Sequence, residues 1–291
     1  MVISLIIGAL MIGSVYGMLA LGYSLIYSAS GLMTFTQGQL LMIGAFLGMQ
    51  FYKVWGLPFL AAFLLTVLIM FLFGMLLEKC LIRVLLNKGA VSIYIVLSTI
   101  GISIILPNLA QALWGSQTIQ VPSIFGVTTV KILGVSVQPE SLLVIAVGLI
   151  AMVLLHLFMT KSRFGISMRA AAMDPLAASS LGINVSLTTG LTWAIAAALA
   201  GGIGVLLGPV YGVSTGMGDI IGNKGFAGAV IGGYGNMYGA IAGSLLLGFV
   251  ETFVAGYITT TYKDFVSFFL LIIVMIFLPR GLFKAKVYDS D

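Results

Sequence analysis

The segment SLLVIAVGLIAMVLLHLFM, residues Ser141–Met159, is an apolar run without a charged side chain. A helix needs roughly 20 predominantly apolar residues to cross the hydrocarbon core of a bilayer, and this run nearly reaches that length. Val2–Tyr27 and Pro58–Leu77 are longer runs of the same kind, and Phe265–Leu278 is a shorter one. Strands of a membrane barrel are shorter and alternate in polarity, so these runs predict membrane-spanning helices.

The composition of the whole chain supports this prediction. Of its 291 residues, 60% are apolar and 7% are charged, whereas a soluble domain carries about 25% charged residues. Such a chain cannot cover a water-facing surface, so we expect the lipid bilayer to be its main solvent. We predict an all-α polytopic membrane protein with a single transmembrane domain, 1–291, and about eight to ten spanning helices. The favoured set has about nine segments, at 3–27, 33–52, 58–78, 90–113, 141–159, 187–207, 221–234, 238–257 and 264–279.

Basic residues predict how the chain is oriented in the membrane. They form three groups that flank the predicted segments: Lys79, Arg83 and Lys88; Lys161, Arg163 and Arg169; and Arg280, Lys284 and Lys286. Short loops rich in Lys and Arg stay in the cytoplasm. All three groups fall on that side only if the weak segment 221–234 also crosses, so we expect the N-terminus outside and the C-terminus in the cytoplasm. The same rule accounts for the net charge of +5, and we expect no nucleic-acid partner.

The stretch 114–140 is the one sizeable loop expected on the outer side. Within it, Val127–Val137 alternates weakly in polarity around Gly134, which favours a small β-hairpin. This hairpin would either touch an external partner or cover lipid headgroups.

The sequence also contains an apparent internal repeat. A glycine-rich weak segment leads into a strong span at Gly38–Glu78, and the same order returns at Gly225–Glu251. Internal repeats with interrupted helices are common in transporters, so the repeat favours a transport function.

Glycine is abundant, with 37 residues, and many pairs have the G-x-x-x-G spacing that lets helices approach closely in lipid. Close packing explains most of them. In Gly201–Tyr211, Gly216–Gly243 and Thr34–Gln39, however, polar residues interrupt the apolar pattern, and irregular backbone at membrane depth is tolerated only inside protein or beside water. We therefore predict broken or half-helices that line a pathway. The candidate pathway residues are Thr34, Gln37, Gln39, Pro209, Asp219, Asn223, Lys224, Asn236 and Glu251.

Few other side chains suggest chemistry. Glu251 lies within a span without a basic residue one turn away, so it is either functional or a hydrogen-bonded group that holds helices together. We expect Glu78 at the membrane interface beside Lys79, and His156 and Cys80 as packing residues, with Cys80 buried. No set of residues has metal-ligand or catalytic-triad spacing, and the phosphate-binding pattern G-x-x-x-x-G-K-[ST] does not occur. We expect no catalytic site, metal or cofactor, and any ATP must be hydrolysed by another polypeptide.

The loop 160–186 is the one long basic segment rich in small residues, and it includes MRAAAMDPLAASSLGINV, residues 168–185. Asp174 and Pro175 are typical of a helix N-cap and first helical position, and Gly182 is typical of the residue just past a helix end. We predict a short helix over Pro175–Leu181. Its small-residue face consists of Leu176, Ala177, Ser180 and Leu181. It lacks the basic face and large anchors of a helix lying on lipid, so a groove on a partner protein fits it better.

This segment resembles the coupling loop of bacterial branched-chain amino acid ABC transporter permeases. The likeness extends over nearly the whole chain, in LGYSLIY (21–27), GQLLMIGA (38–45), GLTWAIAAALAGG (190–202), GVLLGP (204–209) and KGFAGAVIGGYGNMYGA (224–240), with Glu251 at the expected place. One departure affects the cargo. Thr34, Gln37 and Gln39 stand where the family pattern leads us to expect an Asn, a His and a Glu.

The resemblance implies the first of two homologous permease subunits in a bacterial cytoplasmic (inner) membrane. Two cytoplasmic ABC ATPases would dock on the coupling helices, and an extracytoplasmic substrate-binding protein would deliver Leu, Ile or Val. The implied ATPase-coupling residues here are Arg169, Asp174, Pro175, Ala177, Leu181 and Gly182. Relatives that carry urea, amides or other amino acids are the alternative. The residues by themselves also leave open an ion-coupled carrier that uses Glu251 or Asp219, and a channel or a non-transporting scaffold.

Overall fold

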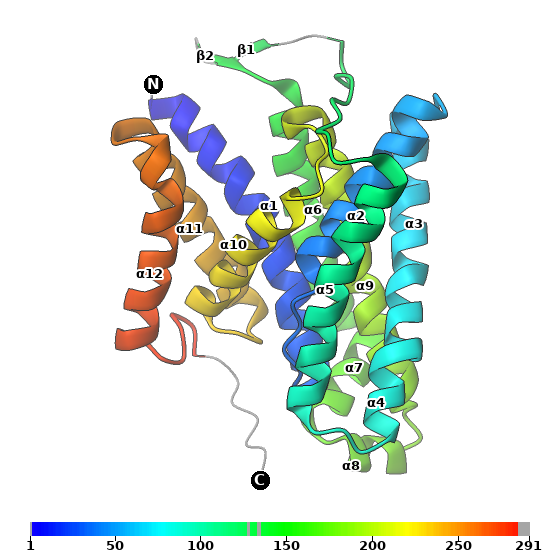
Figure 1. Ribbon diagram of the computed structural model, residues 1–291. Helices are drawn as coiled ribbons and strands as arrows, with labels where there is room; N and C mark the ends of the chain where they lie inside the picture. Colours follow the sequence, from blue (N-terminus) through cyan, green and yellow to red (C-terminus); the bar gives the residue numbers. More distant parts are fainter. Residues whose placement is uncertain (1, 127–128, 133–134, 285–291) are drawn as a thin grey trace.

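The computed structural model describes residues 2–126, 129–132 and 135–284, and most of these residues are helical (Figure 1). The first half contains α1 (Val2–Ser30), α2 (Gln37–Met49), the π-helical turn η1 (Gln50–Val54), α3 (Phe59–Leu77), the π-helical turn η2 (Glu78–Ile82), α4 (Arg83–Asn87) and α5 (Ser92–Trp114). The second half contains α6 (Pro139–Lys161), α7 (Arg163–Met173), α8 (Pro175–Ser180), α9 (Val185–Tyr211), α10 (Met217–Gly232), α11 (Met237–Tyr257), the 3₁₀ turn η3 (Thr260–Tyr262) and α12 (Lys263–Phe277).

A β-hairpin lies in the long loop between the two halves, as the sequence predicted. Strands β1 (Val130–Ile132) and β2 (Val135–Val137) pair antiparallel, with Val130 opposite Val137. The predicted turn residue Gly134 and the predicted first residue Val127 lie outside the described residues. Figure 1 places this hairpin and the N-terminus at one end of the molecule, and α4, α7 and α8 at the opposite end.

Seven helices in the described part of the chain are long and apolar enough to cross a membrane. They correspond to seven of the nine predicted segments, and the all-helical membrane fold is confirmed. The other two predicted segments, 33–52 and 221–234, correspond to α2 with η1, of 13 and 5 residues, and to α10, of 16 residues. Neither is among the seven helices that are long and apolar enough to cross. The predicted count of nine crossings is therefore not established.

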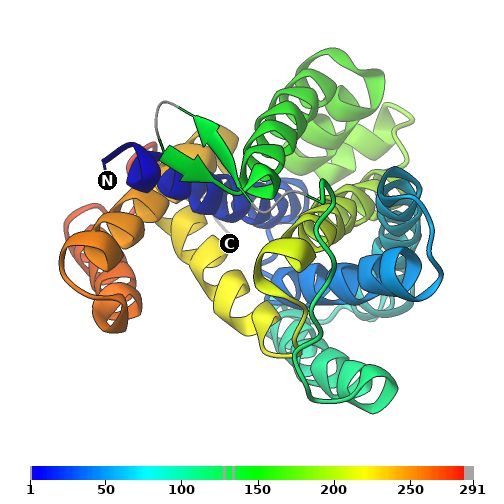
Figure 2. The same ribbon diagram turned by 90° about the horizontal axis from the view of Figure 1, so that it is seen from above.

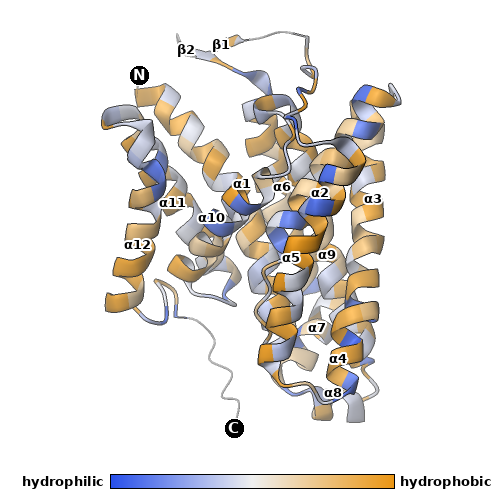
Figure 3. Cartoon of the chain, viewed as in Figure 1, coloured by the Kyte–Doolittle hydropathy of each residue, from blue (hydrophilic) through white to orange (hydrophobic). Residues whose placement is uncertain are grey.

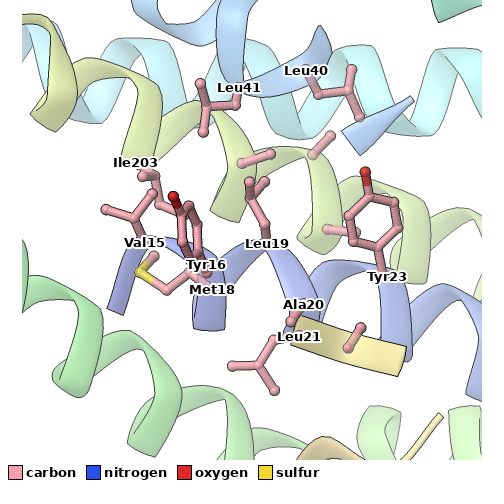
Figure 4. Close-up of a cluster of buried hydrophobic side chains, with 14 of the residues drawn as sticks. Val15, Tyr16, Met18, Leu19, Ala20, Leu21, Tyr23, Leu40, Leu41 and Ile203 are labelled. Carbon is pink, nitrogen blue, oxygen red and sulfur yellow. The ribbon is translucent and has the colours of Figure 1, made fainter. Parts of the chain in front are cut away.

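Two of the long helices form the centre of the molecule. In the apolar part of α9, 78% of the residues are buried, and in that of α1 50% are buried. In the span that contains α12, only 11% of the residues are buried. Seen from above, α3, α5, α6 and α12 surround this centre (Figure 2). The close-up in Figure 4 shows Leu19 and Tyr23 of α1 on the side that faces Leu40 and Leu41 of α2. The outer helices expose many large apolar side chains, as helices in contact with lipid do.

The two halves of the chain share one order of elements. In each, a long helix ends at a left-handed glycine, Gly31 after α1 and Gly212 after α9, and an extended segment then leads into a short helix and another long one. The packing is reciprocal: α1 lies along α11, and α9 lies along α3. This arrangement agrees with the repeat expected from the sequence. The structural repeat begins with α1 and α9, one helix earlier than the predicted repeat, which began in α2 and α10.

The short helices α2 and α10 cross at glycine residues in the interior. A Cβ atom at Gly222 would lie 2.7 Å from the Cα atom of Gly38, and a Cβ atom at Gly38 would overlap the carbonyl oxygen of Gly218. Such close contact of two backbones is what small residues allow between helices in lipid. Hydrophilic residues gather on α2 and around α10 within the otherwise apolar bundle (Figure 3).

The expectation that Cys80 is buried was wrong, because its side chain is exposed. In the π-helical turn η2, Glu78 and Ile82 face inward and are 1% and 0% exposed. This orientation places Cys80, midway between them, on the outer surface.

We expect Gly222→Ala to lower the free energy of unfolding by about 1–3 kcal/mol, because the added methyl group overlaps a backbone atom that cannot move away freely. The measurement is the thermal unfolding midpoint of the purified protein in detergent. Gly101→Ala in α5 is the matched control, because beyond the backbone of its own helix nothing lies within 4 Å of the added Cβ. Equal midpoints for the two variants would contradict the close crossing.

Candidate functional site

The short helix α8 projects from the end of the molecule opposite the hairpin (Figure 1). Asp174 is its N-cap and accepts a hydrogen bond from the Ala177 backbone nitrogen at 2.9 Å, and Pro175 is the first helical residue. Gly182 follows the helix with φ of +80°, a left-handed conformation that glycine adopts without steric cost. The predicted helix and both of its caps are confirmed, with Leu181 as the C-cap rather than the last helical residue.

The surface around α8 is apolar and uncovered. Met173, Leu176 and Leu181 have exposed fractions of about 80% each, among the highest of the apolar side chains. Leu176 and Leu181 belong to the predicted small-residue face, and with Met173 they make this surface more apolar than the sequence analysis predicted. A group of exposed apolar side chains on a rigid element is typical of a protein interaction site.

The sequence analysis treated residues 160–173 as loop, but most of them form helix α7. Ser162 is its N-cap, and its hydroxyl accepts a hydrogen bond from the Gly165 backbone nitrogen at 2.9 Å. Arg169 on this helix is exposed and lines a hollow of about 610 Å³ together with His156 and Tyr238. His156 has a hydrogen-bond partner, the Tyr238 hydroxyl at 3.1 Å from Nδ1, which agrees with its predicted packing role.

Arg83 of α4 connects η2 to the start of α9, just after α8. Arg83 donates to both oxygens of Glu78, at 2.6 and 3.2 Å, and to the backbone oxygen of Ser186 at 2.8 Å. Ser186 is the second residue of α9, just after the loop that carries α8. Glu78, expected near the end of a span, has a buried side chain that is bonded to Arg83.

Polar residues near the starts of the two short helices contact each other, with Gln39 buried and Asp219 exposed. The Gln39 side chain donates to Asp219 at 2.7 Å, which joins the first turn of α2 to the first turn of α10. Thr34 and Thr36, in the extended segment before α2, share a hydrogen bond of 2.8 Å. Gln37 is fully buried beside Gly22. Four predicted pathway residues therefore lie in one region, although Asp219 is 180 residues from Gln39 in the sequence.

A second group of charges links α10, α11 and α12. The Lys224 ammonium lies 2.5 Å from an oxygen of Glu251 and 2.5 Å from an oxygen of Asp264, and the Tyr16 hydroxyl donates to Glu251 at 2.9 Å. Lys224 and Glu251 are both almost completely buried, whereas Asp264 is half exposed. Neither a carboxylate nor an ammonium is stable alone in this environment, so each requires the other.

These charges border a hollow of about 250 Å³ between α1, α9, α10, α11 and the start of α12, which we call the charged hollow. Lys224, Glu251 and Lys263 are in its wall, and the rest is largely apolar. It opens in the half of the molecule that carries the hairpin, since it is lined by the first halves of α1 and α10 and the last turns of α9 (Figure 1).

The remaining candidate pathway residues lie outside these two groups. Asn223 lies one residue from Lys224 but is exposed on the outer face of α10, so it does not face the charged hollow. Asn236 caps α11, accepting from the backbone nitrogens of Tyr238 and Gly239. Pro209 lies in the last turn of α9.

The sequence analysis missed Tyr16, Lys263 and Asp264 as members of the site. A search for opposite charges across spans would have joined Asp264 to Lys224, because acidic residues are rare in this chain and a buried lysine requires a counter-charge. Tyr16 carried no comparable signal in the sequence.

Together, the apolar outer helices, the two short helices that meet in the interior and the exposed capped helix define a multi-pass membrane transport protein. Residues 5–275 match the model of the family described as branched-chain amino acid transport system / permease component. The chain belongs to this family.

The chain is 36% identical to the high-affinity branched-chain amino acid transport system permease protein BraD of Pseudomonas aeruginosa, over 95% of this chain and 94% of the relative. It is 34% identical to the corresponding permease protein LivH of Escherichia coli K12, over 93% and 92% of the two chains. It is 25% identical to the probable permease protein LivH of Methanocaldococcus jannaschii, over 94% and 90%. No solved structure matches the chain significantly.

We expect Lys224→Met to lower the free energy of unfolding by about 3–5 kcal/mol, because it leaves the Glu251 carboxylate buried without a counter-charge. The double variant Lys224→Met/Glu251→Gln should recover part of this loss. Thermal unfolding in detergent measures both, with Lys88→Met, an exposed lysine at the opposite end, as the control. A single variant as stable as the control would show that the pair is not required.

Proposed function

We propose that this chain is one of the two permease subunits of an ATP-driven importer for the branched-chain amino acids Leu, Ile and Val. The observation that carries the proposal is the exposed helix α8, capped at both ends, in a chain whose relatives are named as permeases of such systems. In this proposal the chain acts as one transmembrane unit in the cytoplasmic (inner) membrane of a bacterium. It is not an enzyme, because partner chains hydrolyse the ATP.

The proposed partners are a second homologous permease, two cytoplasmic ABC ATPases and an extracytoplasmic binding protein. The end of the molecule with α4, α7 and α8 would face the cytoplasm, since Lys79, Arg83 and Lys88 lie there with Lys161, Arg163 and Arg169. The N-terminus and the hairpin would then face outward, toward the binding protein.

The mechanism begins at α8. Closure of the ATPase dimer would push on Asp174–Gly182, and the caps keep this helix rigid, so the push is transmitted rather than absorbed. The loop after α8 leads directly into α9, which packs along both α2 and α3. A shift of α9 would therefore move α2 against α10 at the Gln39–Asp219 contact, where the proposed pathway is lined by Thr34, Gln37, Asp219 and Lys224.

The geometry does not favour an ion-coupled carrier. Such a carrier needs a carboxylate that takes up and releases a cation during transport. Glu251 is bound to Lys224 and Tyr16, and Asp219 is bound to Gln39, so both carboxylates already have partners. Urea, amides and other amino acids remain the alternative cargo for the importer.

The proposal predicts that Gly182→Asp abolishes ATP-dependent uptake while the protein still inserts into the membrane. The substitution strains a left-handed position by about 1–2 kcal/mol and places a negative charge at the negative end of the α8 dipole. The measurement is uptake of labelled leucine, valine and urea by vesicles that contain this chain with its permease, ATPase and binding-protein partners.

Gly56→Asp is the matched control. Gly56 also has a left-handed φ, of +67°, and open space around it, but it lies in the turn between η1 and α3, far from α8. It should retain uptake. Normal uptake by Gly182→Asp would exclude a coupling role for α8, and uptake that follows a proton or sodium gradient without ATP would overturn the importer.

A further inference from the structure

We propose that the charged hollow is a binding site for the zwitterionic head group of an apolar amino acid. The α-ammonium group would bind Glu251, the α-carboxylate would bind Lys224 and Lys263, and the side chain would lie against the apolar wall. This inference rests on the proposed function, because it assigns a place on the transport path to the proposed cargo.

The unused hydrogen-bonding capacity of the hollow matches a zwitterion. A carboxylate can accept about four hydrogen bonds, and Glu251 accepts two, from Lys224 and Tyr16. A lysine ammonium has three donors, and Lys224 uses two, on Glu251 and Asp264. Lys263 has no ion-pair partner among the described residues, although it lines the hollow and is half-buried. The wall therefore has free acceptors for an ammonium group and free donors for a carboxylate.

The charge balance of the hollow also favours a zwitterion. The positive charges of Lys224 and Lys263 are matched by the negative charges of Glu251 and Asp264, so the group is neutral as a whole. Asp264 contacts Lys224 from α12 and is not in the wall of the hollow. A neutral amino acid preserves this balance. An acidic or basic amino acid would add an unpaired charge in a region of low dielectric constant, which is costly.

The size and lining of the hollow fit a small aliphatic side chain. Its volume of about 250 Å³ holds roughly eight water molecules at about 30 Å³ each, which is the size class of valine or leucine. The apolar part of its wall includes Met11, Ile12, Val15, Leu207, Ile220 and Ile221. Ligand sites commonly combine such a wall with a few charged groups that fix orientation.

The test uses the assembled transporter, with both permeases and the ATPases but without the binding protein, and measures equilibrium binding of labelled leucine. Lys263→Gln is the decisive variant, because Lys263 belongs to none of the ion pairs that join the helices. We expect this variant to bind leucine at least about tenfold more weakly, since it loses a charge-assisted hydrogen bond. Lys131→Gln in β1 removes the same charge at the same end of the molecule and should bind leucine normally.

Two leucine analogues test the two halves of the head group. Leucinamide lacks the carboxylate and 4-methylpentanoate lacks the ammonium group, so both should compete with leucine at least tenfold more weakly in the wild-type transporter. In Lys263→Gln, the disadvantage of leucinamide relative to leucine should become smaller, because the group that recognises the carboxylate is gone. The disadvantage of 4-methylpentanoate should remain.

The outcomes separate this inference from the proposed function. If the wild-type transporter with its binding protein imports leucine with ATP, but Lys263→Gln binds leucine as well as the wild type does, the head-group site is excluded. The same holds if the importing wild-type complex binds no leucine without the binding protein. If instead no leucine is imported with ATP, the proposed function fails, and binding of leucine that Lys263→Gln weakens would still establish the site.

Discussion

The structure depends on hydrogen-bond partners for the backbone groups at the ends of α2 and α10, two short helices inside a bundle of longer ones. Backbone polar groups away from water must find partners within the protein, and a helix end leaves several of them open. At the end of α10, the carbonyl oxygens of Ile231 and Gly232 accept hydrogen bonds from the backbone nitrogens of Leu282 and Phe283. The segment after α12 thus closes α10, and α10 can stop within the protein because the chain returns to it.

The same two helices connect the ends of the molecule. Around α8, Arg83 joins η2 to the first turn of α9, and α9 packs along α2. From α2, the Gln39–Asp219 hydrogen bond leads to α10, and Lys224 of α10 leads to α11 and α12. Each step is a contact between neighbouring elements. A continuous series of packed contacts therefore joins α8 to the charged hollow.

The sequence predicted the features that depend on neighbouring residues and missed those that depend on distant ones. The caps of α8 follow from Asp174, Pro175 and Gly182, which lie within one short segment, and the long spans follow from apolar runs. The partners of Glu251 could not be found in this way, because Lys224 and Asp264 belong to other helices. Helix α7 was missed because its polar and small residues carry no apolar run, although Ser162 offered an N-cap.

The sequence left two roles open for Glu251, a functional group or a hydrogen-bonded group that holds helices together. Its partners in the structure bear on this choice. If it served only to hold helices together, an apolar residue of similar size would do so at least as well, because burying an ion pair often costs more than its attraction returns. Here the pair with Lys224 lies beside a hollow that contains a further lysine, and both members keep unused hydrogen-bonding capacity. The charges are thus held in place by one another while still able to receive a polar molecule. The pair connects α10 to α11, and in the proposed importer it would also provide the few polar groups that an apolar amino acid needs for its head group.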